Sequence, residues 1–106
     1  MSDHDIREVA EGLQYQGEDE IVAYTINTSN WGGGPSSVTA VVKEVSDDYT
    51  DVTATVMPTN SPSVSTDTIT LSPLKLLTRD KEYRVEVKFT SAGQVLECHF
   101  TVMGQR

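Results

Sequence analysis

Few residues of this chain have side chains suited to catalysis: one cysteine, Cys98, and two histidines, His4 and His99. Cys98 alternates with Leu96 and Phe100, which predicts an inward-facing thiol that behaves as a small hydrophobe with a raised pKa. His99 is the next residue of the same strand and must point to the opposite face, so it cannot serve Cys98 as a base. No catalytic constellation is predicted.

Residues that could bind a metal ion or a phosphate are equally few. Asp47, Asp48 and Asp51 could offer oxygen ligands to calcium, but they lack the register of an EF-hand loop. Aspartates in such turns mostly cap backbone amides, which is the interpretation we favour. Neither histidine has a ligand partner at zinc-binding spacing. The sequence therefore predicts no metal and no cofactor.

Trp31 is followed by three glycines, residues 32–34, which require a special backbone conformation or a close approach. No Gly-Lys-Ser or Gly-Lys-Thr follows, so this loop is not a phosphate cradle. One interpretation is that Trp31 plugs the open end of a β-sandwich. The alternative is that it forms a loop that binds a sugar or a protein partner.

The elements that must position these residues are strands. Residues 77–89 read LTRDKEYRVEVKF, with Tyr83, Val85, Val87 and Phe89 alternating against charged residues. This period of two predicts a half-buried antiparallel strand. Leu77, six residues before Tyr83 and across a polar turn, is typical of the tyrosine corner of immunoglobulin and fibronectin type III sandwiches.

Short alternating segments with turn signals between them recur along most of the chain. We predict an all-β fold, an Ig-like or fibronectin type III-like β-sandwich of about seven antiparallel strands, in a domain over residues 20–106. The expected strands lie at residues 21–26, 37–46, 51–57, around 64, 69–71, 83–90 and 95–102. A chain of 106 residues is large enough for one such core.

Residues 1–19 are predicted to form an extended N-terminal arm with a weak helical period through Ile6, Val9, Ala10 and Leu13. The arm is either a solvated terminus or a segment that docks on a neighbouring subunit. Residues 1–20 hold seven acids and one base, so most of the net charge of −8 lies here. Nucleic-acid phosphates would repel this segment, and we expect no nucleic-acid partner.

The single cysteine excludes an internal disulfide, and no segment is apolar enough to cross a membrane. The first residues also lack a basic and apolar secretory signal. We expect synthesis in a cytoplasm, without export by the general secretory route and without a membrane partner.

Several segments together resemble small proteins of tailed bacteriophages and prophages, of the fibre-tail adaptor or neck type. They are YTINTSNW at 24–31, PSSV at 35–38, VVK at 41–43, DVTATVM at 51–57, SPSVS at 61–65, TITL at 68–71, residues 77–89, and FTV at 100–102. The resemblance covers most of residues 20–103. It implies a non-enzymatic building block of the virion at the head-to-tail neck, tail or capsid, assembled in the host bacterial cytoplasm with other virion proteins and as a homo-oligomer.

Two other functions stay open: a carbohydrate- or host-binding Ig-like module, and an enzyme. Exposed aromatic residues such as Trp31, Tyr49 and Tyr15 would suit the binding module. For an assembly role, we expect the partner contacts at apolar residues of the arm and at the tryptophan loop, namely Ile6, Val9, Leu13, Tyr15 and Trp31.

Overall fold

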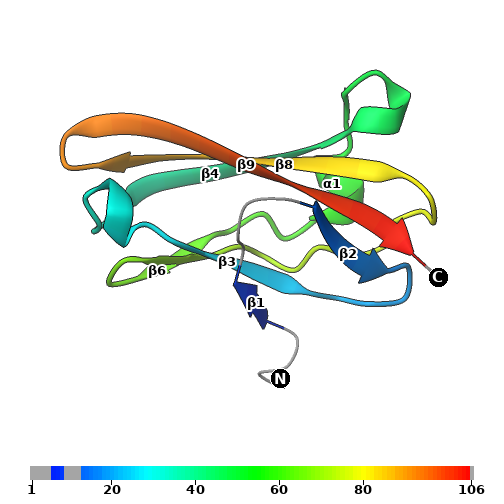
Figure 1. Ribbon diagram of the computed structural model, residues 1–106, viewed down its shortest axis with the longest axis horizontal. Coiled ribbons are helices and arrows are strands. Elements are labelled where there is room, and N and C mark those ends of the chain that lie inside the picture. The colour runs from blue at the N-terminus through cyan, green and yellow to red at the C-terminus, as the bar shows by residue number, and fades with distance from the viewer. Residues whose placement is uncertain (1–5, 9–12, 106) are drawn as a thin grey trace.

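The computed structural model describes residues 6–8 and 13–105, and it is an all-β sandwich of two sheets (Figure 1). A four-stranded sheet has the order β1-β3-β7-β6, and a five-stranded sheet has the order β2-β9-β8-β4-β5. The strands are β1 (Ile6–Glu8), β2 (Leu13–Gly17), β3 (Ala23–Asn27), β4 (Ser36–Glu44), β5 (Thr50–Asp51), β6 (Ser63–Ser65), β7 (Thr68–Thr70), β8 (Glu82–Ser91) and β9 (Gln94–Gln105). The predicted all-β sandwich is confirmed, with nine strands in the described residues.

The core lies between the sheets and consists of the inward positions of each strand. β8 alternates as predicted, with Tyr83, Val85, Val87 and Phe89 buried. From the other sheet, Tyr24 packs its ring 5.2 Å from that of Phe100. The remaining buried apolar side chains of the core are Val22, Ile26, Ala40, Val42, Val56, Met57, Ile69, Leu71, Leu74, Leu77 and Val102. Burial of these side chains is the main force that holds the two sheets together.

The predicted corner interaction is present. Leu77 is buried, and the Thr78 N–H donates to the Tyr83 hydroxyl at 2.9 Å. The same turn packs against β9, where the Gly104 N–H donates to the Lys81 carbonyl at 2.9 Å. A side chain on Gly104 would collide with the Thr78 carbonyl, so the close approach of this turn requires glycine.

One predicted strand is wrong. Residues 51–57 alternate like a strand, but Thr53–Val56 forms a short helix, α1. The Asp51 carboxylate accepts the Thr53 N–H at 2.9 Å and the Thr53 hydroxyl at 2.7 Å, and Thr53 Oγ1 accepts the Val42 N–H at 2.8 Å. These local bonds satisfy the edge of β4 in place of a strand ladder, as Asp and Thr side chains often do.

Part of the expected arm pairs inside the molecule. β2 runs parallel to β9, with Leu13 opposite Thr101 and Gly17 opposite Gln105, and β1 runs parallel to β3. The sandwich therefore contains two parallel pairings in addition to the expected antiparallel ones. The boundary at residue 19 leaves β2 outside the segment predicted as the domain, although β2 completes one edge of the five-stranded sheet.

A buried glutamine anchors β2. Gln16 is 1% exposed, and its amide donates to the Leu74 carbonyl at 2.7 Å and to the Glu20 carbonyl at 3.0 Å. Its carbonyl oxygen accepts the Tyr24 hydroxyl at 2.9 Å. Every polar atom of this buried side chain has a partner, as a buried amide requires. The bonds join β2 to the opposite sheet.

Candidate functional site

The five-stranded sheet has one side that faces away from the core. We call it the outer face. The register places its side chains in rows across the strands, such as Val41, Glu86 and His99 in one row, and Thr39, Lys88 and Glu97 in the next. Further along the same face, Leu13 and Tyr15 of β2 stand beside Thr101 and Met103 of β9.

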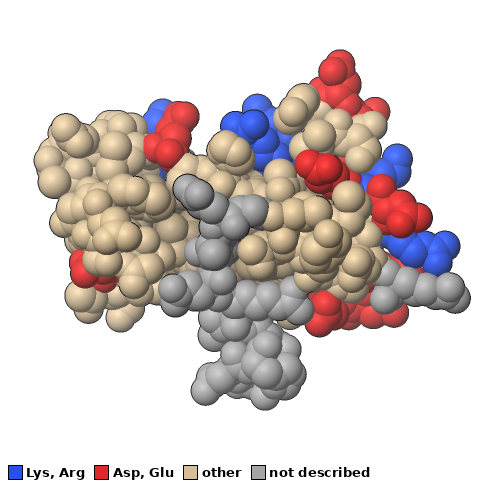
Figure 2. All heavy atoms as spheres, viewed as in Figure 1, with Lys and Arg blue, Asp and Glu red and all other residues tan. Residues whose placement is uncertain are grey.

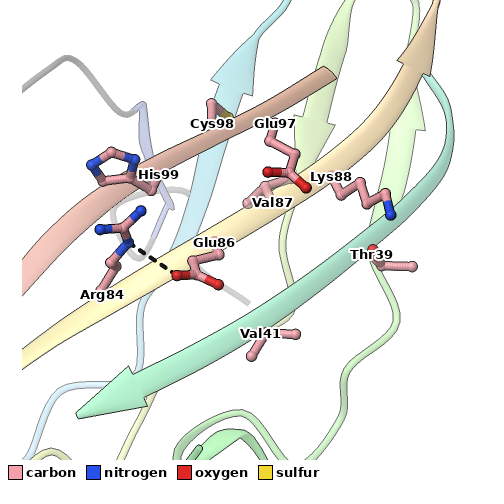
Figure 3. Close-up of a pocket in the computed structure, with 9 residues that line it drawn as sticks. All are labelled: Thr39, Val41, Arg84, Glu86, Val87, Lys88, Glu97, Cys98 and His99. Atoms are coloured by element: carbon pink, nitrogen blue, oxygen red, sulfur yellow. Dashed lines mark ion pairs between the residues drawn. The ribbon is translucent and has the colours of Figure 1, made fainter. Parts of the chain in front are cut away.

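The centre of the outer face is hollowed, with a cavity volume of about 380 Å³. Figure 2 shows the hollow as a notch in the upper surface between two groups of charged side chains. Figure 3 shows side chains from β4, β8 and β9 around it. The lining residues are Thr39, Val41, Arg84, Glu86, Val87, Lys88, Glu97, Cys98 and His99.

Charges of both signs line the hollow. Glu86 forms ion pairs with Arg84, at 3.0 Å from Nε to Oε2, and with Lys43, at 3.5 Å. The Arg84 Nε–H makes no hydrogen bond, so the contact with Glu86 is electrostatic and its N–H is not directed at the carboxylate. Lys88 and Glu97 lie opposite each other, yet no ion pair within the described residues involves either. Half-exposed pairs of this kind contribute little to stability.

The hollow does not assemble a nucleophile with a base. Cys98 belongs to the inward face of β9, and burial raises the pKa of its thiol. His99 is exposed on the outer face, so the predicted opposite orientation of these two residues is confirmed. Among residues 6–8 and 13–105, no group of three or more His, Cys, Asp or Glu side chains could hold a metal ion. The charges and the apolar area of this surface are suited to contact with another molecule.

Two of the predicted contact residues lie on the outer face. Leu13 is 38% exposed and Tyr15 is 52% exposed, and the two are consecutive outward positions of β2. Ile6 lies in β1, where only the backbone is described, and Val9 lies outside the described residues. The structure thus brings Leu13 and Tyr15 together and leaves Ile6 and Val9 as predictions.

Trp31, the fifth predicted contact, lies at one end of the sandwich in the 3-10 turn η2 (Ser29–Trp31). Its ring centroid is 5.9 Å from that of Phe89, so it covers part of the core. It nevertheless remains 45% exposed. The interpretation of Trp31 as a plug therefore describes the part of the ring that packs on Phe89, and the binding interpretation stays a prediction for the part that faces solvent.

The tryptophan loop is held by two neighbouring turns. Thr28 donates both its N–H and its hydroxyl to the Asp67 carbonyl, at 2.8 and 2.7 Å. The Asp67 carboxylate accepts the Gly34 N–H at 3.0 Å, and the Ser91 hydroxyl donates to the Gly33 carbonyl at 2.6 Å. These bonds order the loop before any ligand binds, which lowers the entropic cost of binding.

Sequence reasoning missed Val95 as a contact site and considered Tyr49 only as an exposed aromatic residue of a binding module. Val95 is 63% exposed and occupies an outward position of β9. Tyr49 is 51% exposed on the loop after β4, which contains the 3-10 turn η3 (Val45–Asp47). Val95 could have been found from its place among the polar outward residues of β9, whereas the direction of the Tyr49 loop depends on tertiary contacts.

Half of the exposed large hydrophobic residues lie on or beside the outer face. Of the eight large hydrophobic residues that are exposed among those described, Leu13, Tyr15 and Val95 lie on the outer face and Tyr49 lies on a loop at its end.

No helix within the described residues is long and apolar enough to span a membrane. A comparison of the chain with known protein families, with curated proteins and with solved structures finds no match.

Proposed function

We propose that this chain is a non-enzymatic structural protein of a tailed-phage virion, which assembles with other virion proteins at the neck, tail or capsid. The observation that supports an assembly role best is the outer face, where three exposed apolar side chains surround a hollow with charges of both signs. The sequence resemblance supports the virion context. Repeated packing of one rigid sandwich against its neighbours is the mechanism.

The outer face has the composition that such packing needs. Leu13, Tyr15 and Val95 supply apolar area, and the charged rows between them restrict the orientation of a partner. Interfaces of this kind gain affinity from a few buried aromatic and apolar anchors and gain specificity from charge complementarity. Tyr15 is the strongest candidate anchor, since tyrosine is enriched at energetic hot spots.

The experiment is to induce particles from a strain that carries the gene, to purify them and to quantify this chain by mass spectrometry. We expect the wild-type chain in the particles and a strong loss of incorporation for Tyr15→Ser. The matched control is Leu76→Ser, because Leu76 is equally apolar and 63% exposed but lies outside the outer face. Complete particles without the wild-type chain would refute the proposal, and equal loss for both variants would refute the outer face as the interface.

The second candidate function is a carbohydrate-binding module, and the ordered loop that presents Trp31 favours it. An exposed indole on a rigid, nearly uncharged loop is suited to stacking on a sugar ring. The chain has one tryptophan, so its intrinsic fluorescence reports on Trp31 alone. A glycan array followed by fluorescence titration tests this function, and no fluorescence change with any sugar, together with no effect of Trp31→Ala, would exclude it.

A further inference from the structure

The edge of β9 that faces away from β8 is only partly covered by β2. The pairing with β2 extends from Thr101 to Gln105, and in the described part of the chain no strand lies beside residues 94–100 on that edge. We call residues 94–100 the open edge. On the opposite side of the same sheet, β4 has side chains in place of a strand, where the Val42 N–H donates to the Thr53 hydroxyl at 2.8 Å. An uncovered edge is a template for pairing with a further strand.

The alternation along β9 identifies the backbone groups that point at the open edge. The Gly104 N–H donates to the Lys81 carbonyl on the β8 side, whereas the Gln105 carbonyl accepts the Glu18 N–H on the β2 side. Successive residues of a strand direct their N–H and C=O groups to opposite edges, and the register between β8 and β9 has no shift. The open edge therefore receives the N–H and C=O groups of Val95, Glu97 and His99. No described residue bonds to these groups.

Both sides of the open edge have apolar area that an added strand would cover. Val95, on the outer face, is 63% exposed. Leu96 and Cys98, on the core side, pack against the margin of the core and are only partly buried. A strand beside them would bond to the free backbone groups and remove this apolar area from water. Strand addition of this kind is a common mode of recognition between protein chains.

The open edge admits only a strand that ends close to β2. Leu13 occupies the position beside Thr101, so an added strand cannot continue past Phe100. β9 itself ends in a suitable way, because the tight turn at Ala92 and Gly93 returns the chain into β8. Both turn residues are left-handed, with φ of 52° and 77°, as in a two-residue hairpin turn. The end of the β8–β9 hairpin of a second copy can therefore lie beside the open edge without meeting β2.

We infer that the open edges of two copies of this chain pair antiparallel about a two-fold axis at Leu96, which joins their five-stranded sheets into one. Val95 of each copy then lies opposite Glu97 of the other, and each such pair exchanges two backbone hydrogen bonds. On the core side, Leu96 packs against Leu96 of the second copy. Both copies use the same surface, so the contact closes as a dimer.

The neighbouring registers are less favourable than an axis at Leu96. An axis at Cys98 would place Val95 of the second copy beside Thr101, where Leu13 lies. An axis at Glu97 would place two carboxylates directly opposite each other, and like charges in that position are destabilising. With the axis at Leu96, the methylene groups of Glu97 cover the exposed side chain of Val95 instead.

The dimer adds to the proposed function and does not depend on it. The axis is perpendicular to the sheet, so the outer faces of the two copies point the same way and stay uncovered. The pair would offer other virion proteins a surface twice as wide as that of one copy.

Cysteine cross-linking of the full-length protein tests the register. Leu96→Cys in a Cys98→Ser background places two thiols at the axis, where directly opposed Cα atoms lie about 4.5 Å apart, close enough for a disulfide. We expect a covalent dimer under mild oxidation with copper phenanthroline. Glu97→Cys in the same background should give little, because its thiol lies opposite Val95. Equal cross-linking of the two variants, or none for Leu96→Cys, would overturn the inference.

Proline substitution tests the backbone bonds. Glu97→Pro removes an N–H that points away from β8, so the hydrogen bonds within the sheet stay intact. Sedimentation velocity across a concentration series should show the dimer Kd raised about ten-fold or more, because each copy loses one bond to the other.

The matched control is Val64→Pro. Val64 lies in the edge strand β6, next to Ser65, which closes the two-residue turn into β7, so the Val64 N–H also points away from its neighbouring strand. This variant should leave the Kd unchanged, and melting curves should show that both proline variants are folded. A wild-type chain that stays monomeric at high micromolar concentration would overturn the inference, as would an unchanged Kd for Glu97→Pro.

The two proposals fail separately. A monomeric chain that is nevertheless found in purified particles removes the dimer and leaves the virion function standing. A stable dimer with the expected cross-link at residue 96, produced by a chain that is absent from complete particles, leaves the dimer standing and removes the virion function.

Discussion

Replacement of Gln16 is the sharpest test of whether β2 belongs to the folded domain. Gln16 is fully buried, and its amide bonds to the Leu74 carbonyl and to the Tyr24 hydroxyl across the sandwich. Gln16→Met keeps the length of the side chain and removes both bonds. The Leu74 carbonyl then keeps the Val22 N–H as its donor, and the Tyr24 hydroxyl loses the glutamine acceptor.

The expected cost follows from those two groups. One intramolecular hydrogen bond contributes about 0.5–1.5 kcal/mol, so the loss of the bonds to the Leu74 carbonyl and the Tyr24 hydroxyl gives roughly 1–3 kcal/mol. The Glu20 carbonyl, the third partner, belongs to an exposed residue that water can reach, so it adds little. For a domain of this size, the loss lowers the melting temperature by roughly 4–20 °C.

The assay is urea denaturation followed by tryptophan fluorescence and circular dichroism, with Gln14→Met as the matched control. Gln14 lies in the same strand and is only half-buried, and no hydrogen bond of its side chain links it to the opposite sheet in the described residues. Tyr24→Phe removes the same hydroxyl-to-amide bond from the other side, so the losses of Gln16→Met and Tyr24→Phe should be less than additive in the double variant.

An unchanged free energy of unfolding for Gln16→Met would refute the reasoning. It would mean that β2 detaches readily and that residues 1–19 behave as a separate arm, as the sequence pattern suggested. Deletion of residues 1–17 separates the two outcomes further, because it should destabilise the domain at least as much as Gln16→Met if β2 is part of the fold.

Three further predictions concern the corner and the α1 region. Tyr83→Phe should lower the free energy of unfolding by about 1 kcal/mol, because the Thr78 N–H loses its acceptor. Tyr83→Ala should lower it by about 3–5 kcal/mol, because the ring is lost. Equal losses for the two variants in chemical denaturation would contradict the corner bond. Gly104→Ala should destabilise by about 1–3 kcal/mol or more through collision with the Thr78 carbonyl, and a melting temperature equal to wild type would refute that contact. Hydrogen bonds from the side chain and backbone of Thr53 lower the pKa of Asp51 below its ordinary value of 3.8. Ionised Asp51 therefore stabilises the fold above about pH 4, and melting curves should show the difference between wild type and Asp51→Ala vanishing as the pH falls through the folded-state pKa.

The side-chain directions within the strands of the outer face were more predictable than the positions of the segments at its edges. The outward position of His99 and the inward position of Cys98 followed from alternation along one strand. The partner-contact prediction for Leu13 and Tyr15 found residues that do lie exposed, although on a strand of the sheet. The loop after β4 that carries Tyr49 was predicted as a turn, and its position at the end of the outer face was not, because turn residues specify a reversal of the chain and not its direction in space.

The sequence by itself determined the elements whose signal is local. The alternation in residues 83–90 and 95–102, the turn between them and the spacing from Leu77 to Tyr83 predicted the two central strands and the corner, because a period of two and a short turn act within a few residues. Only the tertiary structure decided that residues 53–56 coil into α1, that Leu13–Gly17 joins β9 in parallel, and that the hollow and the Tyr49 loop share one face. The pairing of β2 and the position of the loop depend on contacts between residues far apart in the chain, such as Gln16 with Leu74, and α1 depends on the contact of Thr53 with Val42 in addition to its local bonds to Asp51.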